Sequence, residues 1–388
     1  MTIRALLMMV ALGVSSVPAA GQSVFNAAGL GVPIEPLDGR ARALGSVGVG
    51  LRGGAFTPND PAALGRLTVS TGIVVGQPSW VEYSSDPGEG GNFQGNRFPL
   101  LGLAYPMLNG MMSVQIGSFL DQHYRATSVG SVDLGTGTVA STDEFVQDGS
   151  VSTFNVGYAR LIGSDVSVGV TLGRLAGSVD RILTRSFDDG ATSGVDDYTT
   201  RGTWSYRGHS VTAGASADFG PRLRMAASVQ VPTALEADAS GATSGGDRTF
   251  DLPIQIRAGG SAALMTGLVV VGSVSLADWS NTQGDLTGAS RAGMANTFGA
   301  GLELTQARLL GWDAPLRFGF RHSGLPFAFD DEGATERIFS GGFGLSLNTT
   351  NDVVLAGLDF ALERGLRSGA GITENFWRAT ISFLASGF

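Results

Sequence analysis

The chain has 388 residues, enough for two ordinary domains or one large all-β barrel, so length alone does not decide the fold. Its 59 glycines are about twice the average usage, whereas only 15% of its residues are charged. The net charge of −9 argues against nucleic-acid binding, and the lack of cysteine excludes disulfides, thiolate metal sites and a cysteine nucleophile.

The amino end carries the features of a secretory signal peptide. Arg4 provides a positive n-region, residues 5–14 form an apolar h-region, and residues 19–21 (AAG) are a small-residue cleavage site before Gln22. We therefore expect residues 1–21 to be removed on export and leave them out of the fold. Beyond them, no apolar run approaches the ~20 residues that a membrane helix needs.

Residues 39–64 form a glycine-rich stretch that contains a G-x-G-x-x-G motif at positions 48–53. A dinucleotide-binding loop needs a strand before this motif and a helix after it. Pro58 and Pro61 prevent such a helix, and the segments that follow are strand-like, without crossover helices. The motif therefore does not indicate a nucleotide site, and we expect no cofactor.

From Leu67 onward the sequence alternates apolar with small or polar residues at period two, as half-buried strands do. Single-chain outer-membrane barrels have an even number of strands, from 8 to about 26, and the number of such segments in this chain is even and lies within that range. We therefore expect an all-β fold, an antiparallel transmembrane β-barrel over residues 65–388. About fourteen strands are predicted, at residues 67–73, 98–105, 112–117, 154–158, 166–172, 211–215, 223–231, 250–257, 268–276, 298–304, 316–320, 339–345, 354–362 and 377–383.

The connections between these segments alternate between short and long. Short turns follow the second, fourth, sixth, eighth and twelfth segments, with Asn109-Gly110 suited to a tight turn. The tenth connection, at residues 306–314, is longer than this pattern predicts. Outer-membrane barrels have short periplasmic turns and long external loops, so we expect both ends of the barrel segment in the periplasm and all the long loops outside.

One face of each segment is apolar, and the other carries small residues and most of the strand charges. Leu67, Val69 and Ile73 lie on such an apolar face, which we expect to meet lipid. An arginine facing lipid at mid-bilayer costs about 2–4 kcal/mol, so the charged face is expected to line the lumen. Its charged residues are Arg224, Arg257, Glu303, Arg317, Arg321, Asp359, Glu363 and Arg378. The aromatic residues expected in an interfacial girdle are Trp80, Tyr83, Tyr105, Tyr124, Trp204, Trp279 and Trp377.

A barrel of this size, with inward residues that are mostly Gly, Ser, Ala and Thr, would be hollow unless another segment filled it. Residues 22–64 form the only long segment without strand periodicity. Irregular backbone is tolerated at membrane depth when it is buried in protein. We therefore expect residues 22–64 to fold inside the lumen as an N-terminal hatch that plugs it.

Four short motifs resemble those of one family of barrels. In the hatch they are ARALG at residues 41–45, followed by the glycine-rich run, and NDPAAL at residues 59–64. In the barrel they are AYP at residues 104–106, before the first tight turn, and ADWS at residues 277–280. With these motifs the sequence resembles the outer-membrane long-chain fatty-acid transporter (FadL-like) superfamily, which includes PorV/PorQ-type barrels.

This resemblance implies a barrel that takes up small, fatty-acid-like hydrophobic molecules passively across the outer membrane of a Gram-negative-type bacterium. It implies no enzyme. The alternative is a PorV-like barrel that does not transport and acts as a secretion-associated anchor or shuttle, or as a structural surface protein. The expected partners are outer-membrane lipids and lipopolysaccharide, a hydrophobic ligand, and the barrel assembly machinery, which would bind the C-terminal strand that ends at Phe388.

The resemblance also assigns roles within the hatch. Asn59, Pro61 and Ala62 match the family's Asn-Pro-Ala turn, which Asp60 interrupts. Because unpaired charges are costly in an occluded lumen, we expect the lumen charges to pair with one another and with hatch residues. Such pairs either hold the hatch in place or line a polar route for a substrate. The candidate hatch residues are Arg40, Arg42, Gly45, Gly48, Gly50, Asn59, Asp60, Pro61 and Ala62.

Metal and catalytic chemistry find little support in the sequence. His123, His209 and His322 are scattered, without the spacing of a metal site. His209 and Ser210 are neighbours in a predicted strand and point to opposite faces, so they do not form a nucleophile and base. Acidic residues of the expected external loops are either solvated or bind divalent cations at a lipopolysaccharide surface; they are Asp188, Asp189, Asp196, Asp197, Asp330, Asp331 and Glu332.

Overall fold

The computed structural model describes residues 23–387, apart from 54–55, 87, 89, 134–136, 188–195, 242, 244, 287–289, 310–311, 332 and 351–352. The predicted signal peptide at residues 1–21 lies outside the described residues. So do Phe388, with which we expect the assembly machinery to interact, and three of the acidic loop residues, Asp188, Asp189 and Glu332.

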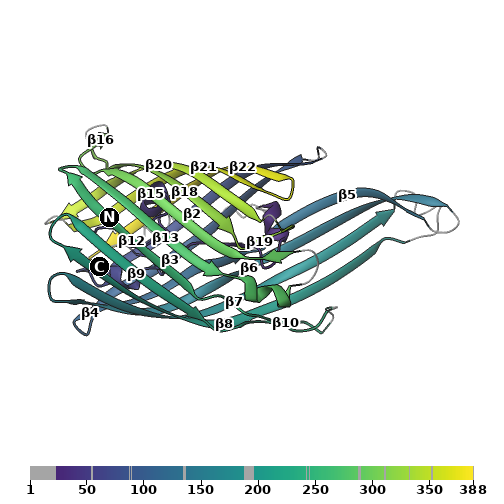
Figure 1. Cartoon of the computed structure of the whole chain (residues 1–388), viewed down its shortest axis with the longest axis horizontal. Coiled ribbons are helices and arrows are strands. Elements are labelled where there is room, and N and C mark those ends of the chain that lie inside the picture. Colours follow the sequence, from purple (N-terminus) through teal and green to yellow (C-terminus); the bar gives the residue numbers. More distant parts are fainter. Residues whose placement is uncertain are drawn as a thin grey trace.

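The chain forms a closed antiparallel barrel of fourteen strands, as the alternating pattern predicted (Figure 1). Each strand pairs with the next along the barrel, and the pairing of the first with the last closes the wall. The strands are β2 (Thr71–Ser85), β3 (Gly90–Met107), β4 (Gly110–Asp121), β6 (Thr138–Ile162), β7 (Val166–Phe187), β8 (Tyr198–Phe219), β9 (Leu223–Pro232), β12 (Gln255–Met265), β13 (Leu268–Asp278), β15 (Met294–Leu304), β18 (Leu316–Leu325), β20 (Ala334–Thr350), β21 (Val353–Gly369) and β22 (Ile372–Ser386).

Three of these strands extend well beyond the barrel wall on one side. β6, β7 and β8 are 25, 22 and 22 residues long, and β5 (Tyr124–Asp133) adds to the outer half of β6. β10 (Leu235–Ala239) pairs with the outer half of β8 and with β11 (Arg248–Phe250). β5 and the outer halves of β6, β7 and β8 form the projection at the right of Figure 1.

The connections confirm the predicted alternation of short and long only in part. Leu108 and Asn109 both have positive φ, 55° and 57°, as in the mirror-image turns that suit tight hairpins. We call the end of the barrel that carries this β3–β4 turn the turn end, and the opposite end the loop end. The long tenth connection contains a small hairpin of β16 (Arg308–Leu309) and β17 (Trp312–Asp313). The expectation that all loop-end connections are long is wrong, because Ala370 and Gly371 form a tight turn between β21 and β22.

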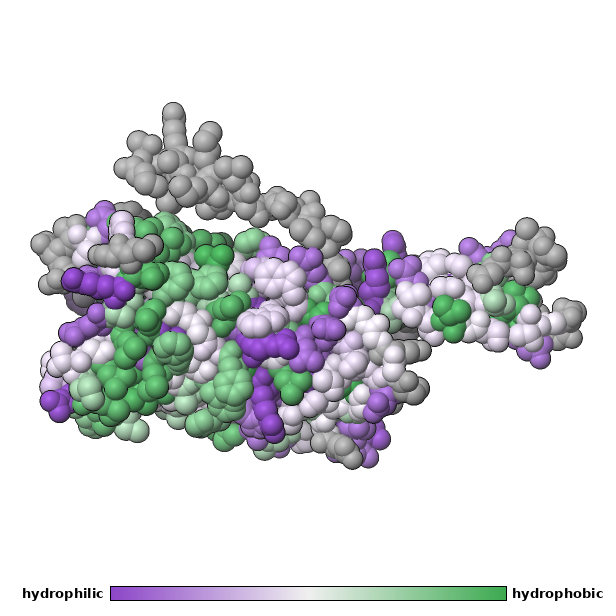
Figure 2. All heavy atoms as spheres, turned by 90° about the horizontal axis from the view of Figure 1, so that it is seen from above, coloured by the Kyte–Doolittle hydropathy of each residue, from purple (hydrophilic) through white to green (hydrophobic). Residues whose placement is uncertain are grey.

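An apolar band covers the outside of the barrel. Figure 2 shows apolar side chains gathered over the barrel, whereas the projection is mostly pale or hydrophilic. Among the described residues, no helix is long and apolar enough to cross a membrane. Exposed side chains of the band include Leu101, Leu103, Val114, Ile116, Val168, Val170, Leu172, Val211, Val229, Val274, Phe298, Phe318 and Phe339.

Several aromatic and apolar side chains lie on a different face from the one predicted. Trp80, Tyr105 and Trp377 are exposed on the wall, but Trp204 and Trp279 are buried inside the barrel and do not belong to a girdle. β2 begins at Thr71 rather than Leu67, and Ile73 faces the lumen, not lipid. The physical reason is that Phe56 and other hatch residues make the lumen apolar here, so an inward isoleucine is buried against them.

The N-terminal segment lies inside the barrel. It contains η1 (Val24–Ala27), β1 (Val32–Pro33), α2 (Gly39–Ala43) and α3 (Pro61–Leu64). α2 packs against β18, β20, β21 and β22, whereas α3 packs against β6, β7 and β8 on the other side of the wall. At the loop end, η2 (Ser280–Asp285) and the short pair β14 (Arg291–Ala292) and β19 (Phe327–Ala328) complete the described elements.

Glycines let the hatch backbone touch the wall directly. Gly45 has a φ of 77°, and a Cβ atom there would lie 2.4 Å from the carbonyl oxygen of Phe320 and 2.5 Å from that of Ala300. On the wall side, Gly299 and Gly319 face Gly45 at similarly close range. The high glycine content therefore reflects close packing between two backbones.

This contact can be tested with a pair of alanine substitutions. We expect Gly45→Ala to lower the free energy of unfolding by about 2–4 kcal/mol, because it combines a left-handed alanine with an overpacked contact. Gly333 has a φ of 79° and no described atom within 4 Å of its Cβ position, so Gly333→Ala should cost only about 1 kcal/mol. Urea titration of the folded barrel in detergent measures both, and equal effects would contradict the close contact.

Candidate functional site

Asp60 organises the second half of the hatch. It is the N-cap of α3, and its Oδ1 accepts a hydrogen bond from the Ala63 backbone N–H at 3.3 Å. Its Oδ2 accepts a second one from the Gly50 N–H at 3.0 Å, and the side chain is buried. Pro61 follows at the first helical position, where its fixed φ suits a helix start. The residue that interrupts the Asn-Pro-Ala motif thus joins α3 to the glycine-rich run.

Small hydroxyl residues of the wall donate hydrogen bonds to the hatch backbone. The Ser228 hydroxyl donates to the Asn59 carbonyl at 2.6 Å, and the Ser167 hydroxyl donates to that of Ala62 at 2.7 Å. The Ser261 hydroxyl donates to the Gly50 carbonyl at 3.0 Å. These contacts satisfy irregular backbone that has no secondary structure of its own. The remaining glycine of the candidate set, Gly48, packs against Leu37 within the hatch.

Glu303 joins the hatch to the wall through two arginines. Arg40 of α2 donates to both Glu303 carboxylate oxygens, at 3.0 and 2.7 Å. Arg317, the cross-strand partner of Glu303, donates to it at 2.8 Å and also bonds to Asp359. Glu303 and Arg317 are almost fully buried. Their charges are therefore stable only because Arg40 and Asp359 also pair with them and offset the cost of removing the charges from water.

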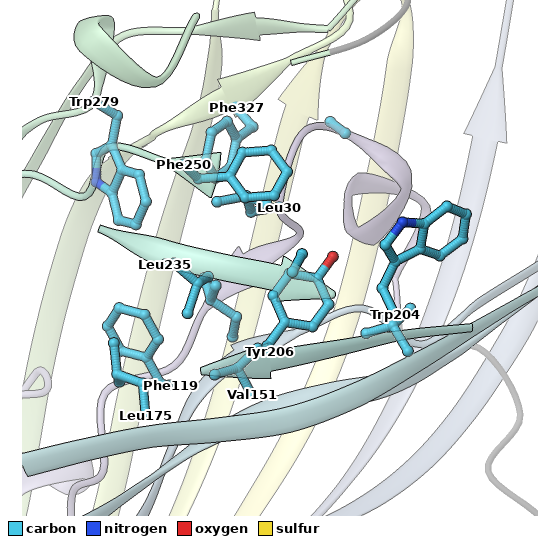
Figure 3. Packing of buried hydrophobic residues seen from close by; sticks show 14 of the residues in the cluster. Leu30, Phe119, Val151, Leu175, Trp204, Tyr206, Leu235, Phe250, Trp279 and Phe327 are labelled. Carbon is cyan, nitrogen blue, oxygen red and sulfur yellow. The ribbon is translucent and has the colours of Figure 1, made fainter. Parts of the chain in front are cut away.

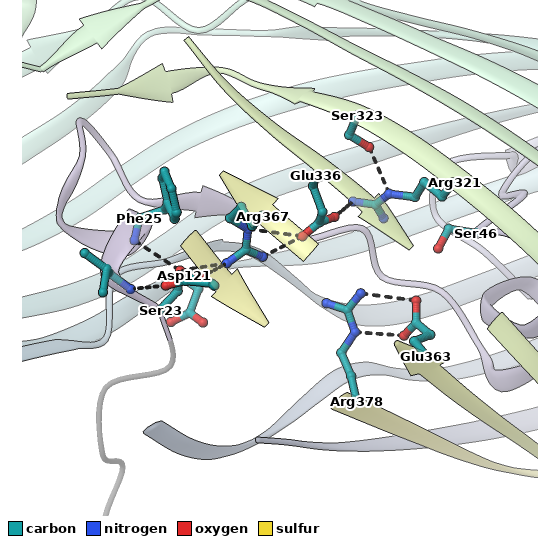
Figure 4. Close-up of polar contacts among 12 residues, drawn as sticks. Ser23, Phe25, Ser46, Asp121, Arg321, Ser323, Glu336, Glu363, Arg367 and Arg378 are labelled. Atoms are coloured by element: carbon teal, nitrogen blue, oxygen red, sulfur yellow. Dashed lines mark hydrogen bonds and ion pairs between the residues drawn. The ribbon is translucent and has the colours of Figure 1, made fainter. Parts of the chain in front are cut away.

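A second chain of charges runs along β18, β20, β21 and β22 to the start of the hatch (Figure 4). Arg321 lies 2.7 Å from Glu336, which is also 2.6 Å from Arg367. Arg367 pairs in turn with Glu374 at 2.6 Å, and the Ser23 hydroxyl donates to the same carboxylate at 2.9 Å. Sequence reasoning missed Glu336, Arg367 and Glu374 because the predicted strands were too short to include them.

The other candidate charges are distributed around the lumen. Glu363 and Arg378 form a separate buried pair at 2.7 Å, visible in Figure 4. Arg224 pairs with Asp218 at 2.7 Å and donates to the Leu51 carbonyl. Two further arginines of the candidate set, Arg42 and Arg257, bond to neutral groups and not to the carboxylates that the prediction assigned to them. Arg42 donates to the Glu35 carbonyl and the Ser46 hydroxyl, and Arg257 bonds to the side-chain amides of Gln230 and Gln255.

A cavity of about 100 Å³ lies between the hatch and the wall. The hatch contributes residues 33–36 and 58–59 to its lining, and eight wall strands contribute the rest. Polar side chains such as Arg257 and Arg321 line one part, whereas Phe119 and Trp279 line another. The cavity therefore offers both an apolar surface and hydrogen-bonding groups.

An apolar cluster fills the lumen on the loop-end side of this cavity (Figure 3). It combines hatch residues with inward side chains of several wall strands, so it is a core built inside a membrane barrel. Two of its members, Phe119 and Trp279, also line the cavity. The cluster comprises Ala28, Leu30, Phe119, Leu120, Val151, Leu175, Val179, Trp204, Tyr206, Leu235, Ala237, Phe250, Ala277, Trp279 and Phe327.

The wall is not evenly paired next to the cavity. The β3–β4 ladder runs from Met107↔Gly110 only to Leu100↔Gly117, although both strands continue towards the loop end. The last residues of β4 pair instead with the hatch strand β1, Pro33 opposite Leu120. We call the space between residues 97–99 of β3 and 118–120 of β4 the wall gap. Ser118 and Phe119 line both this gap and the cavity.

A polar cluster lies at the loop-end side of the wall gap. Arg97 of β3 is 3.6 Å from Asp121 of β4, which is 2.6 Å from His123. His123 also lies 3.2 Å from Asp148 of β6. Burial lowers the pKa of His123, but the hydrogen bond and the negative charge of Asp121 raise it further, so the net direction is upward.

The other two histidines and two of the described loop acids lie apart from the cluster at His123. Among the described residues, no group of three or more His, Cys, Asp or Glu side chains is arranged to hold a metal ion. Asp331 pairs with Arg291 at 2.6 Å on the surface, and Asp197 accepts a hydrogen bond from the Phe187 N–H. His209 and His322 lie on β8 and β18, far apart in the barrel order.

A closed antiparallel barrel with an apolar outer band and a hatch in its lumen is an outer-membrane-type β-barrel. Neither a protein-family model nor a curated protein sequence matches the chain. By structure it resembles the toluene transporter TbuX of Ralstonia pickettii, at 18% identity and a TM-score of 0.60, over 94% of this chain and 100% of that one.

Two further solved structures share this architecture. One is a FadL homologue of Pseudomonas aeruginosa, at 11% identity and a TM-score of 0.62, over 92% of this chain and 99% of that one. The other is the toluene transporter TodX of Pseudomonas putida, at 12% identity and a TM-score of 0.58, over 93% and 99%. The predicted resemblance to the FadL-like superfamily is confirmed at the level of the fold.

The ionic anchor of the hatch can be tested at Glu303. Glu303→Gln leaves the buried Arg317 and the half-buried Arg40 without their shared carboxylate, which should cost about 3–5 kcal/mol of unfolding free energy. Asp313→Asn is the matched control, because Asp313 pairs with Arg308 at 3.0 Å on an exposed hairpin. Urea titration of both variants should show a large loss for the first and little change for the second. A stability equal to wild type in Glu303→Gln would show that the hatch is held by other contacts.

The cluster at His123 predicts a pH dependence with a defined sign. Because the folded pKa is raised, the contribution of protonated His123 is fully present below its ordinary value of about 6.5 and is lost as pH rises through the folded value. We expect His123→Gln to lower stability more at about pH 6 than at about pH 9. A larger loss at the higher pH would reverse the sign and reject the assignment.

Proposed function

We propose that this chain is an outer-membrane channel through which small hydrophobic molecules enter the cell by passive diffusion. In this proposal the signal peptide at residues 1–21 directs export, residues 22–64 are the hatch, and residues 65–388 form the barrel. The observation that carries the proposal is the wall gap, since it adjoins a cavity that lies under an apolar cluster.

The route begins at the loop end, which we place outside the cell. The apolar cluster there offers a hydrophobic molecule a surface away from water, at about 25 cal/mol per Å² of buried apolar area. Phe119 and Trp279 connect the cluster to the cavity below it. Local repacking of these side chains would move the molecule from the mouth into the cavity.

The exit that the geometry favours is sideways through the wall gap. A direct path along the barrel axis is blocked by the hatch and by the ion pairs that join Arg40 of the hatch to Glu303 and Arg317 of the wall. An apolar molecule gains nothing from such a polar path, whereas the wall gap leads from Ser118 and Phe119 to the apolar band outside. The proposed role of the lumen charges is therefore to hold the hatch, and the substrate route avoids them.

The similar structures support hydrophobic uptake in general. Two of them are described as toluene transporters and one as a FadL homologue, so a fatty-acid-like substrate is a narrower part of our proposal. Contacts with lipopolysaccharide and with the barrel assembly machinery belong to the same proposal. The alternative is a PorV-like barrel that anchors a secreted protein. No specific observation in the described residues favours this alternative.

Closing the wall gap with a disulfide tests the proposal on a background without native cysteine. The Ser118 hydroxyl lies 3.5 Å from the Phe98 carbonyl, so the two residues are neighbours across the gap, and Phe98→Cys with Ser118→Cys introduces one thiol on each side of it. We expect the oxidised variant to lose accelerated uptake of a fluorescent hydrophobic dye into cells, and reductant to restore it. The measurement is the dye uptake rate relative to cells without the barrel.

The matched control is a cysteine pair within the continuous ladder. Leu103 and Val114 are cross-strand partners there, so Leu103→Cys with Val114→Cys should leave uptake unchanged when oxidised. Uptake that continues with the gap closed would reject the sideways exit. If wild type accelerates no hydrophobic probe and instead co-purifies with a secreted protein, the PorV-like alternative replaces the transport proposal.

A further inference from the structure

β5 is the edge strand of the projection. The projection is a sheet in the order β5, β6, β7 and β8, and β6 is the only described strand that pairs with β5. Figure 1 shows β5 along the margin of this sheet, beyond the barrel wall. A Cβ atom on Gly130, in the outer half of β5, would meet no described atom within 4 Å. The proposed uptake route does not use this strand.

The edge of β5 lacks the features that usually prevent one sheet from pairing with another. An edge strand presents a row of backbone N–H and C=O groups, and proteins protect it with proline, lysine, a bulge or a short length. β5 is ten residues long, has neither proline nor lysine, and pairs with β6 without a register shift. Most of its side chains are exposed, among them Val129 at 76%. The strand can therefore accept a further strand at this edge.

The two charged residues of β5 have opposite signs and lie near its two ends. Arg125 is the second residue of the strand and Asp133 the last, and this even spacing places both side chains on one face. In an antiparallel pair of two copies, the register that places Val129 opposite Val129 also places each Arg125 opposite an Asp133. Parallel pairing in register would place like charges opposite each other, which destabilises a sheet. The charges therefore favour an antiparallel strand of the same sequence as the partner.

The same register is compatible with the neighbouring side chains. Arg125 lies 3.6 Å from Glu144 of β6, and both side chains are about half exposed. Asp133 of a second copy would approach Arg125 from the other edge of β5, and a guanidinium has enough N–H donors for both carboxylates. Between the charges, Thr127 would lie opposite Ser131, a pair whose hydroxyl groups can hydrogen-bond across strands.

We propose that β5 pairs with β5 of a second copy of this chain and joins the two projections into one continuous sheet, with four strands from each copy. Antiparallel pairing places the two barrels at opposite ends of that sheet. Barrels in one membrane share one orientation, so such a pair links two membranes that face each other. Because the projection extends from the loop end, which we place outside the cell, the contact joins two outer-membrane surfaces. This role is separate from the proposed uptake function and does not require it.

Two charge reversals test the pairing and its register. Arg125→Asp places carboxylates opposite each other at both ends of the paired strands, and Asp133→Arg does the same with guanidinium groups. Each variant alone should self-associate about tenfold more weakly than wild type. An equal mixture of the two should regain the affinity, because every charge then lies opposite one of the other sign. The measurement is sedimentation of the full-length barrel in detergent.

The matched control is Arg201→Asp, which reverses an exposed charge on β8 at the other side of the projection. It should leave self-association unchanged, and heat-dependent gel mobility checks that each barrel is folded. A mixture of folded variants that associates no better than either alone would overturn the register. A wild type that stays monomeric would overturn the pairing itself.

Single cysteines locate the residues that lie opposite each other, since the chain has no native cysteine. Opposite residues of an antiparallel pair have Cα atoms about 4.5–5.5 Å apart, within reach of a disulfide. Val129→Cys should therefore form a disulfide-linked dimer on oxidation. Thr127→Cys lies on the same face but should not, because its two copies would be four residues apart along the strands, roughly 13 Å. Linkage through Thr127→Cys alone, or through neither, would reject the register.

Vesicle clustering tests whether the pair links two membranes. Phosphatidylcholine vesicles that carry the wild-type barrel should cluster, as measured by turbidity. Vesicles with Arg125→Asp and vesicles with Asp133→Arg should cluster only when the two are mixed. A protein that dimerises in detergent but clusters no vesicles would overturn the link between membranes. None of these measurements involves uptake, so a failure of the proposed transport would leave their results unchanged.

Discussion

The position of the hatch depends on Glu303, which lies between Arg40 of the hatch and Arg317 of the wall. Charges in an occluded lumen are stable only when each has a partner, and removing one partner leaves another charge uncompensated. Glu303 therefore specifies where Arg40, and with it α2, must lie. Once α2 is fixed in this way, the rest of residues 23–70 must follow the inner wall, and the cavity is the space left over.

The hatch in turn determines the shape of the wall. Both β3 and β4 continue towards the loop end beyond the last residues that pair. Over Leu120 and Asp121, β4 pairs with the hatch strand β1 and not with β3. Each edge of a strand can pair with only one neighbour. Because β1 occupies the edge of β4 at Leu120 and Asp121, β3 cannot pair there, and the wall gap results. In the proposed function, the hatch therefore excludes an axial path through its ion pairs and leaves a lateral path next to Phe119 through the pairing of β1.

The sequence allowed the strand number and the filled lumen to be predicted, because period-two alternation and an excess of small inward residues are local signals. It did not reveal that Ile73, Trp204 and Trp279 face inward, since an apolar hatch reverses the expected polarity of the lumen. Glu336 was missed because strands extend beyond their apolar centres. The wall gap depends on which distant segment pairs with β4, and no single-segment pattern contains that information.

The two sides of the hatch are held by contacts of unequal strength. α2 is fixed by buried ion pairs, whose separation costs several kcal/mol, whereas the Asn59 and Ala62 carbonyls accept neutral hydroxyl hydrogen bonds of about 1 kcal/mol each. Residues 58–59 also line the cavity. In the proposed function, residues 58–59 move to admit a molecule, and the contacts that break are these neutral hydrogen bonds. A hatch anchored on one side can move locally on the other without leaving the barrel.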